Sequence, residues 1–119
     1  MITKKFIDTE LARLVADTKS FINTLISINF TPSKIKELSS IQQDLEKLYL
    51  NVVDQNISDK NTQHNYKKIQ ELLSKQHKIL VNLHFTEIAL IHEKADVQVA
   101  TSFLIQDIND FLHRQTQKN

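Results

Sequence analysis

The side chains in this 119-residue chain that are best suited to chemistry are three histidines in its second half. His77, His84 and His92 are spaced by seven and eight residues, so on one helix they would form a stripe about 80° wide. Imidazoles are common metal ligands, but the ligands of one ion lie about 2 Å from it, whereas seven helical residues span about 10 Å. We therefore expect no metal or cofactor site within one chain, and we interpret these histidines as satisfied side chains at the edge of the core.

Glu87 is the second candidate, because it falls on an apolar seam between Leu83 and Leu90. An unpaired carboxylate is costly to bury, so a carboxylate at such a position has either a functional role or a structural partner. We favour the structural interpretation. In it, Glu87 pairs with His84 one turn earlier, pairs with a cation from another helix, or reaches water at the edge of the fold.

No residue pattern predicts catalysis, so we do not expect an enzyme. The absence of glycine excludes phosphate-binding loops and dinucleotide fingerprints, and the absence of cysteine excludes a thiol nucleophile. Serines and threonines are plentiful, but none lies in a nucleophile-elbow motif. A histidine phosphotransfer bundle is an alternative, although no histidine is followed by both a lysine at i+3 and a glycine at i+4. A metal-binding bundle with a site shared between chains is another alternative.

Charge is unevenly distributed, although the formal net charge is only +1. Residues 60–78 contain five lysines and one acid, a net of +4, whereas residues 87–110 contain five acids and one lysine, a net of −4. Four lysines of the first segment would share one helical face, which is typical of a solvated surface; they are Lys67, Lys68, Lys75 and Lys78. That face has no aromatic residues beside the lysines that could stack on nucleic-acid bases. We therefore do not expect a nucleic-acid partner, and a nucleic-acid-binding regulator is kept as an alternative.

The composition indicates one all-α domain over residues 1–119. Hydrophobic residues make up 40% of the chain and charged residues 24%, which is typical of a globular protein. Glycine is absent and Pro32 is the only proline, whereas sheets joined by tight hairpins need residues with positive φ. The longest apolar run, residues 88–91, is too short to span a membrane, and no apolar run follows Lys4 and Lys5 as in a signal peptide. We expect a cytoplasmic protein that does not enter a membrane.

The first half of the chain predicts two helices, over residues 4–28 and 32–55. In the first, apolar residues recur at alternating spacings of three and four, the pattern of an amphipathic helix; the seam is Ile7, Leu11, Leu14, Thr18, Phe21 or Ile22, and Leu25. Thr31 can cap a second helix whose first residue is Pro32. The link between the two helices is about three residues long, which favours antiparallel neighbours.

The second half predicts helices over residues 63–95 and 96–115. The seam of the last segment is Val97, Ala100, Leu104, Ile108, and Phe111 or Leu112. No glycine or proline forces a break at 95–96, so the alternative is one long helix. One chain could hardly cover such a helix, and it would imply a homodimer. The expected architecture is an antiparallel bundle of three to four helices with coiled-coil-like packing.

Two apolar strips merge near the end of the third predicted helix. From Val81 onward, a strip that includes Phe85 and Ile88 joins the seam, so the apolar arc would span about 240° of the helix, wider than a surface helix needs. This region is therefore predicted to be deeply buried or to bind a partner. The candidate partner-binding residues are Val81, His84, Phe85, Glu87, Ile88 and His92.

These features predict a non-enzymatic protein-interaction module that acts by helix packing. A small chaperone, an immunity protein or a regulatory protein would fit this description. We expect a protein partner, with a homodimer as an alternative.

Overall fold

Four helices make up the part of the chain that the structure describes. The computed structural model describes residues 4–53, 55, 59–86, 88 and 95–116. The helices are α1 (Lys4–Ser27), α2 (Pro32–Val52), α3 (Lys60–Thr86) and α4 (Ala95–Thr116). These residues include no strand, and the expected all-α class is confirmed.

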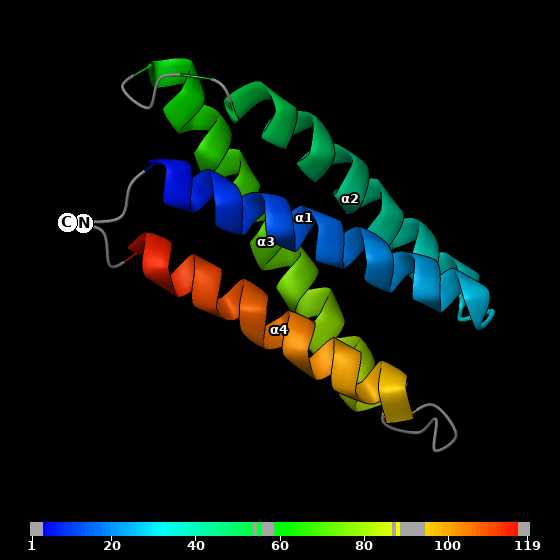
Figure 1. Ribbon diagram of the computed structural model, residues 1–119. Coiled ribbons are helices and arrows are strands. Elements are labelled where there is room, and N and C mark those ends of the chain that lie inside the picture. The colour runs from blue at the N-terminus through cyan, green and yellow to red at the C-terminus, as the bar shows by residue number, and fades with distance from the viewer. Residues whose placement is uncertain (1–3, 54, 56–58, 87, 89–94, 117–119) are drawn as a thin grey trace.

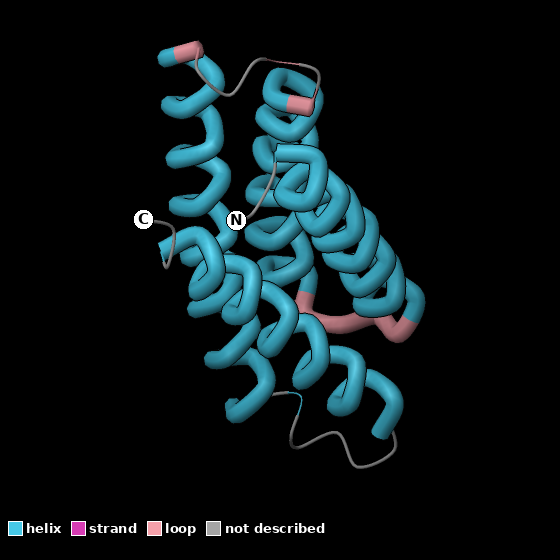
Figure 2. Tube along the Cα trace, turned by 60° about the vertical axis from the view of Figure 1, so that its left-hand side comes forward, coloured by secondary structure: helices cyan, strands magenta, loops and turns pink. Residues whose placement is uncertain are grey.

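The helices form a four-helix bundle in which each helix packs against two others. α1 and α3 each contact both α2 and α4. Consecutive helices run in opposite directions, and the start of α1 lies at the same end of the molecule as the end of α4 (Figure 1). Only a short loop joins α1 to α2 (Figure 2). The molecule measures 47 × 24 × 18 Å, as expected for long helices with short connections.

The core consists of one apolar seam from each helix. The predicted seam of α1 is buried along its whole length; it comprises Ile7, Leu11, Leu14, Thr18, Phe21, Ile22 and Leu25. Leu38, Leu45 and Val52 of α2 face it. α3 contributes Ile69, Leu73, Leu80 and Leu83. Each such side chain stabilises the fold by about 1.5–3 kcal/mol when it is fully buried.

The seam of α4 differs from the predicted one at a single position. Val97, Leu104 and Ile108 are buried as expected, but Ala100 is exposed and Thr101 is buried in its place. The Thr101 hydroxyl donates to the Val97 carbonyl at 2.6 Å, so its polar group is satisfied within its own helix. This bond allows a threonine to occupy a core position at little cost.

Asn29 ends α1 in the left-handed conformation, with φ of 55°. The Asn29 N–H donates to the Ile26 carbonyl at 3.1 Å, and the Phe30 N–H donates to the Leu25 carbonyl at 3.0 Å. These two bonds define a Schellman motif, and the buried Phe30 and Leu25 side chains supply the apolar contact that accompanies it. Asparagine takes the role that glycine usually plays, because it tolerates positive φ better than most residues.

α2 begins at Pro32, as predicted. The Thr31 carbonyl accepts the N–H groups of Lys34 and Ile35, each at 3.1 Å, whereas the Thr31 hydroxyl does not cap the helix. The helix ends at Val52 instead of residue 55. At that end the Lys4 ammonium donates to the Val52 carbonyl at 2.9 Å, which satisfies one of the carbonyls left without a partner within the helix.

The bounds of α3 differ from the predicted ones. The helix begins at Lys60 instead of residue 63, because Asp59 caps it: the Asp59 carboxylate accepts the Asn61 N–H at 2.8 Å. It ends at Thr86, and most of the predicted stretch beyond it, up to residue 95, lies outside the described residues. α3 and α4 are therefore two helices, and the alternative of one long helix over both segments is wrong. The length of the last helix therefore gives no reason to expect a second chain.

None of the helices in the described ranges is both long enough and apolar enough to cross a membrane.

Candidate functional site

The end of α3 carries an exposed aromatic group with two half-buried neighbours. Phe85 is 71% exposed, and Val81, one turn earlier, is half-buried. The His84 ring meets the Phe85 ring edge-on, with 5.1 Å between centroids and 77° between planes. The Nδ1 atom of His84 is buried and has no hydrogen-bond partner within the described residues. The exposed Phe85 ring has His84 and Val81 beside it, and exposed aromatic side chains of this kind are enriched in protein interfaces.

The remaining predicted residues do not all join this surface. Ile88 is fully buried in the core, and its carbonyl accepts a hydrogen bond from the Gln98 side chain at 3.3 Å. Its side chain therefore packs inside the bundle and cannot contact a partner. Glu87 and His92 lie outside the described residues.

A second exposed apolar surface, which was not predicted, lies on α4. Phe103 is 64% exposed, and Val99, one turn earlier, is also exposed. Phe103 borders a hollow of about 230 Å³ between α1 and α4, which is lined by Asp17, Ser20, Phe21, Thr24, Ala100, Phe103, Leu104 and Asp107. The signal in the sequence was an aromatic residue that lies off the seam of its helix, since Phe103 precedes the buried Leu104.

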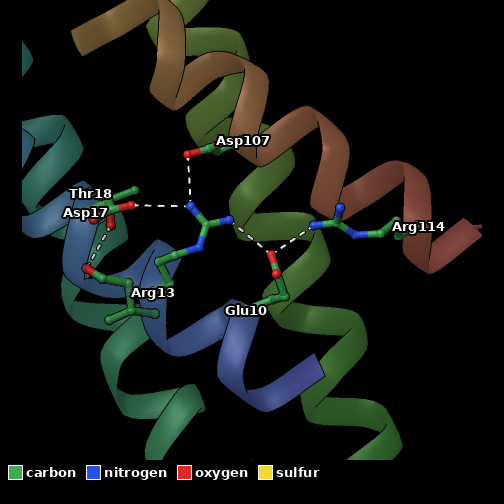
Figure 3. A network of polar contacts seen from close by, with 7 residues as sticks. Glu10, Arg13, Asp17, Thr18, Asp107 and Arg114 are labelled. Atoms are coloured by element: carbon green, nitrogen blue, oxygen red, sulfur yellow. Dashed lines mark hydrogen bonds and ion pairs between the residues drawn. The ribbon is translucent and has the colours of Figure 1, made fainter. Parts of the chain in front are cut away.

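A network of ion pairs joins α1 to α4 (Figure 3). One oxygen of Glu10 accepts hydrogen bonds from Arg13 at 3.0 Å and from Arg114 at 2.9 Å. The other terminal nitrogen of Arg13 lies 3.2 Å from Asp107 and 3.8 Å from Asp17. The hydrogen bond to Glu10, together with the charge of Asp107, raises the pKa of Arg13. Both arginines are paired with carboxylates, so the network holds α1 and α4 together and its cations are already engaged within the protein.

A second polar cluster joins three helices at the opposite end from Phe85. The Lys4 ammonium lies 2.5 Å from the Asp8 carboxylate and donates to the carbonyls of Val52 and Val53. The Tyr66 hydroxyl donates to the other Asp8 oxygen. Burial, and then the bond to the charged Asp8, raise the pKa of Tyr66 well above its usual range. All three Lys4 donors are engaged within the protein, so this cluster is structural.

The histidines do not form a ligand set within the described ranges. His77 and His84 are half-buried on α3. Among the residues that the structure describes, no group of three or more His, Cys, Asp or Glu side chains could hold a metal ion.

Comparison with known proteins adds no assignment. No protein-family model, curated protein or solved structure matches this chain.

Proposed function

We propose that this protein is a cytoplasmic, non-enzymatic interaction module that binds a protein partner by helix packing, as a small chaperone, immunity protein or regulator does. The observation that carries the proposal is the exposure of two phenylalanines on helix faces, 71% for Phe85 and 64% for Phe103. Burial of a phenylalanine side chain contributes about 1.5–3 kcal/mol, so a partner that covers either residue gains that stabilisation.

Each phenylalanine has the surroundings of an interface anchor. Phe85 has Val81 and His84 beside it on α3, and Phe103 has Val99 one turn earlier on α4. Single exposed apolar side chains are common on protein surfaces, but aromatic residues with apolar neighbours are typical of binding sites. The helices that carry them are held together by a packed core and by the Glu10 network, so the surfaces are preformed.

Capture of a partner from a native lysate tests this function. Immobilised wild-type protein is compared with the variants Phe85→Ser and Phe103→Ser, and with the control Leu50→Ser. Leu50 is 70% exposed but lies on α2, away from both surfaces, so it matches Phe85 in exposure.

We expect wild type and Leu50→Ser to retain the same protein, and at least one phenylalanine variant to retain about tenfold less. Equal capture by all four proteins would refute the proposal. Light scattering of the same set identifies a homodimer, since self-association would then be lost only in the phenylalanine variants.

A further inference from the structure

A groove runs along the junction of α2 and α3, and neither Phe85 nor Phe103 lines it. It consists of two hollows that meet at Lys75. The first has a volume of about 410 Å³ and is lined by Asp44, Lys47, Leu48, Lys68, Glu71, Leu72 and Lys75. The second, of about 670 Å³, is lined by Ser33, Lys36, Glu37, Ser40, Ile41, Lys75, Lys78 and Ile79. We call the two together the α2–α3 groove.

The floor of the α2–α3 groove is apolar. Ile41 and Leu48 of α2, and Leu72 and Ile79 of α3, are half-buried and pack against the core. The two residues on each helix are seven positions apart, so they present matching apolar steps along the groove. From Ser33 to Leu48 the groove follows about 22 Å of α2 at 1.5 Å per residue. These dimensions suit about four turns of a docked helix.

The rim of the groove carries charges that form no ion pairs with other described residues. Five lysines and three acids line it, so the groove has a net charge of +2. None of these eight side chains makes an ion pair with another described residue. The α1–α4 face differs, because its arginines are neutralised by Glu10, Asp17 and Asp107.

We propose that the α2–α3 groove binds an acidic amphipathic helix of a protein partner. Apolar residues of that helix at i, i+3, i+4 and i+7 would contact the four floor residues, and its Glu or Asp side chains would pair with the rim lysines. This inference rests on the proposed function, since it names the chemistry of a partner and a docking face for it.

The test uses the full chain and a synthetic peptide probe. The probe is a fluorescent helical peptide of about 18 residues, about 27 Å long, with Leu at heptad positions a and d and Glu at the flanking positions. A second peptide replaces Glu by Lys, and a third replaces Leu by Ser. The protein variant Lys75→Glu/Lys78→Glu reverses the rim charge. The variant Lys60→Glu/Lys67→Glu makes the same change in net charge on exposed positions of α3 that do not line the groove.

We expect saturable anisotropy changes with the Glu/Leu peptide, and affinity reduced at least about tenfold by Lys75→Glu/Lys78→Glu. The control variant should stay within about twofold, and neither of the other peptides should bind. The same circular dichroism melting curve for both double variants and wild type establishes that folding is unchanged.

Three results would overturn the inference. One is no saturable binding of the Glu/Leu peptide. Another is binding of a DNA duplex, lost in Lys75→Glu/Lys78→Glu, with the steep salt dependence of phosphate contacts. The third is a wild-type dimer that Lys75→Glu/Lys78→Glu dissociates, because a second copy would then fill the groove. If peptide binding fails while Phe85- or Phe103-dependent capture persists, the groove inference fails and the proposed function stands.

Discussion

At the scale of single residues, two buried glutamines differ in their hydrogen bonds. The Gln42 amide donates to the Val15 carbonyl at 2.8 Å, and its oxygen accepts from the Thr18 hydroxyl at 2.5 Å. Gln76 occupies a comparable seam position on α3, where its side-chain oxygen is buried and has no hydrogen-bond partner within the described residues. A satisfied polar pair and an unsatisfied polar atom have opposite effects on stability.

Replacing each glutamine by leucine should therefore give opposite results. Gln76→Leu removes an unsatisfied buried acceptor and should raise the free energy of unfolding by up to about 1 kcal/mol. Gln42→Leu breaks two hydrogen bonds and should lower it by about 1 kcal/mol. Urea unfolding followed by circular dichroism measures both. Destabilisation of similar size in the two variants would contradict the difference in hydrogen bonding.

Asn29 is a residue whose identity matters to the backbone. Its φ of 55° is unfavourable for a residue with an ordinary side chain. Asn29→Ala should lower the thermal midpoint and cost about 1 kcal/mol, whereas Asn29→Gly should be neutral or stabilising. Thermal unfolding of both variants tests the motif, and an alanine variant as stable as the glycine variant would be incompatible with it.

At the scale of helices, the Lys4 cluster shows how side chains join elements that do not pack directly. Tyr66 of α3 donates to Asp8 of α1, and Lys4 links Asp8 to the end of α2. α1 and α3 lie across the bundle from each other, so these polar contacts connect them at one end of the core. Its interactions are specific to the folded state, which makes stability depend on pH.

The Tyr66 hydroxyl sets the direction of that dependence. Folding raises its pKa above the ordinary value of 10.0, so above that pH the unfolded chain releases a proton that the folded protein keeps. The unfolded state then binds fewer protons, and the free energy of unfolding falls as pH rises.

Tyr66→Phe should remove this part of the decline. At pH 7 the variant should be less stable by about 1 kcal/mol because the bond to Asp8 is lost. Between about pH 9 and about pH 11 its stability should approach that of wild type. Urea unfolding at a series of pH values measures the difference, and a gap that stays constant across this range would argue against the raised pKa.

At the scale of the whole molecule, Ile88 belongs to the core although it lies outside helices α1 to α4. Its side chain is fully buried, while Phe85 in the preceding turn is mostly exposed. Of these two predicted partner-binding residues, Ile88 is therefore buried in the bundle and Phe85 is exposed to solvent.

Alanine substitutions at these two positions should separate the two environments. Ile88→Ala leaves a cavity and should cost about 2–4 kcal/mol, whereas Phe85→Ala should change stability by less than about 0.5 kcal/mol. Chemical unfolding at pH 7 measures both. A large loss in Phe85→Ala would mean that its ring contributes to packing within the chain.

Some features of the folded structure could be predicted from sequence patterns, and others could not. The seam of α1 and the start of α2 at Pro32 were predictable, because spacing and the position of proline are local properties. The burial of Thr101 in place of Ala100 was not predictable. It depends on how α4 is rotated against its neighbours and on the hydrogen bond from Thr101 to Val97. The sequence did not separate the buried Ile88 from the exposed Phe85, because both lie on the apolar strip that begins at Val81.

The order of residues alone specifies an all-α chain, its helical faces and the short first connection. These properties follow from the periodicity of neighbouring residues and from the absence of glycine. Packing among helices far apart in the sequence decides the rest: the end of α3 at Thr86, the exposure of Phe85 and Phe103, and the α2–α3 groove. Residues beside the apolar seam of a helix are buried or exposed according to whether another helix covers them. That helix comes from a distant part of the chain.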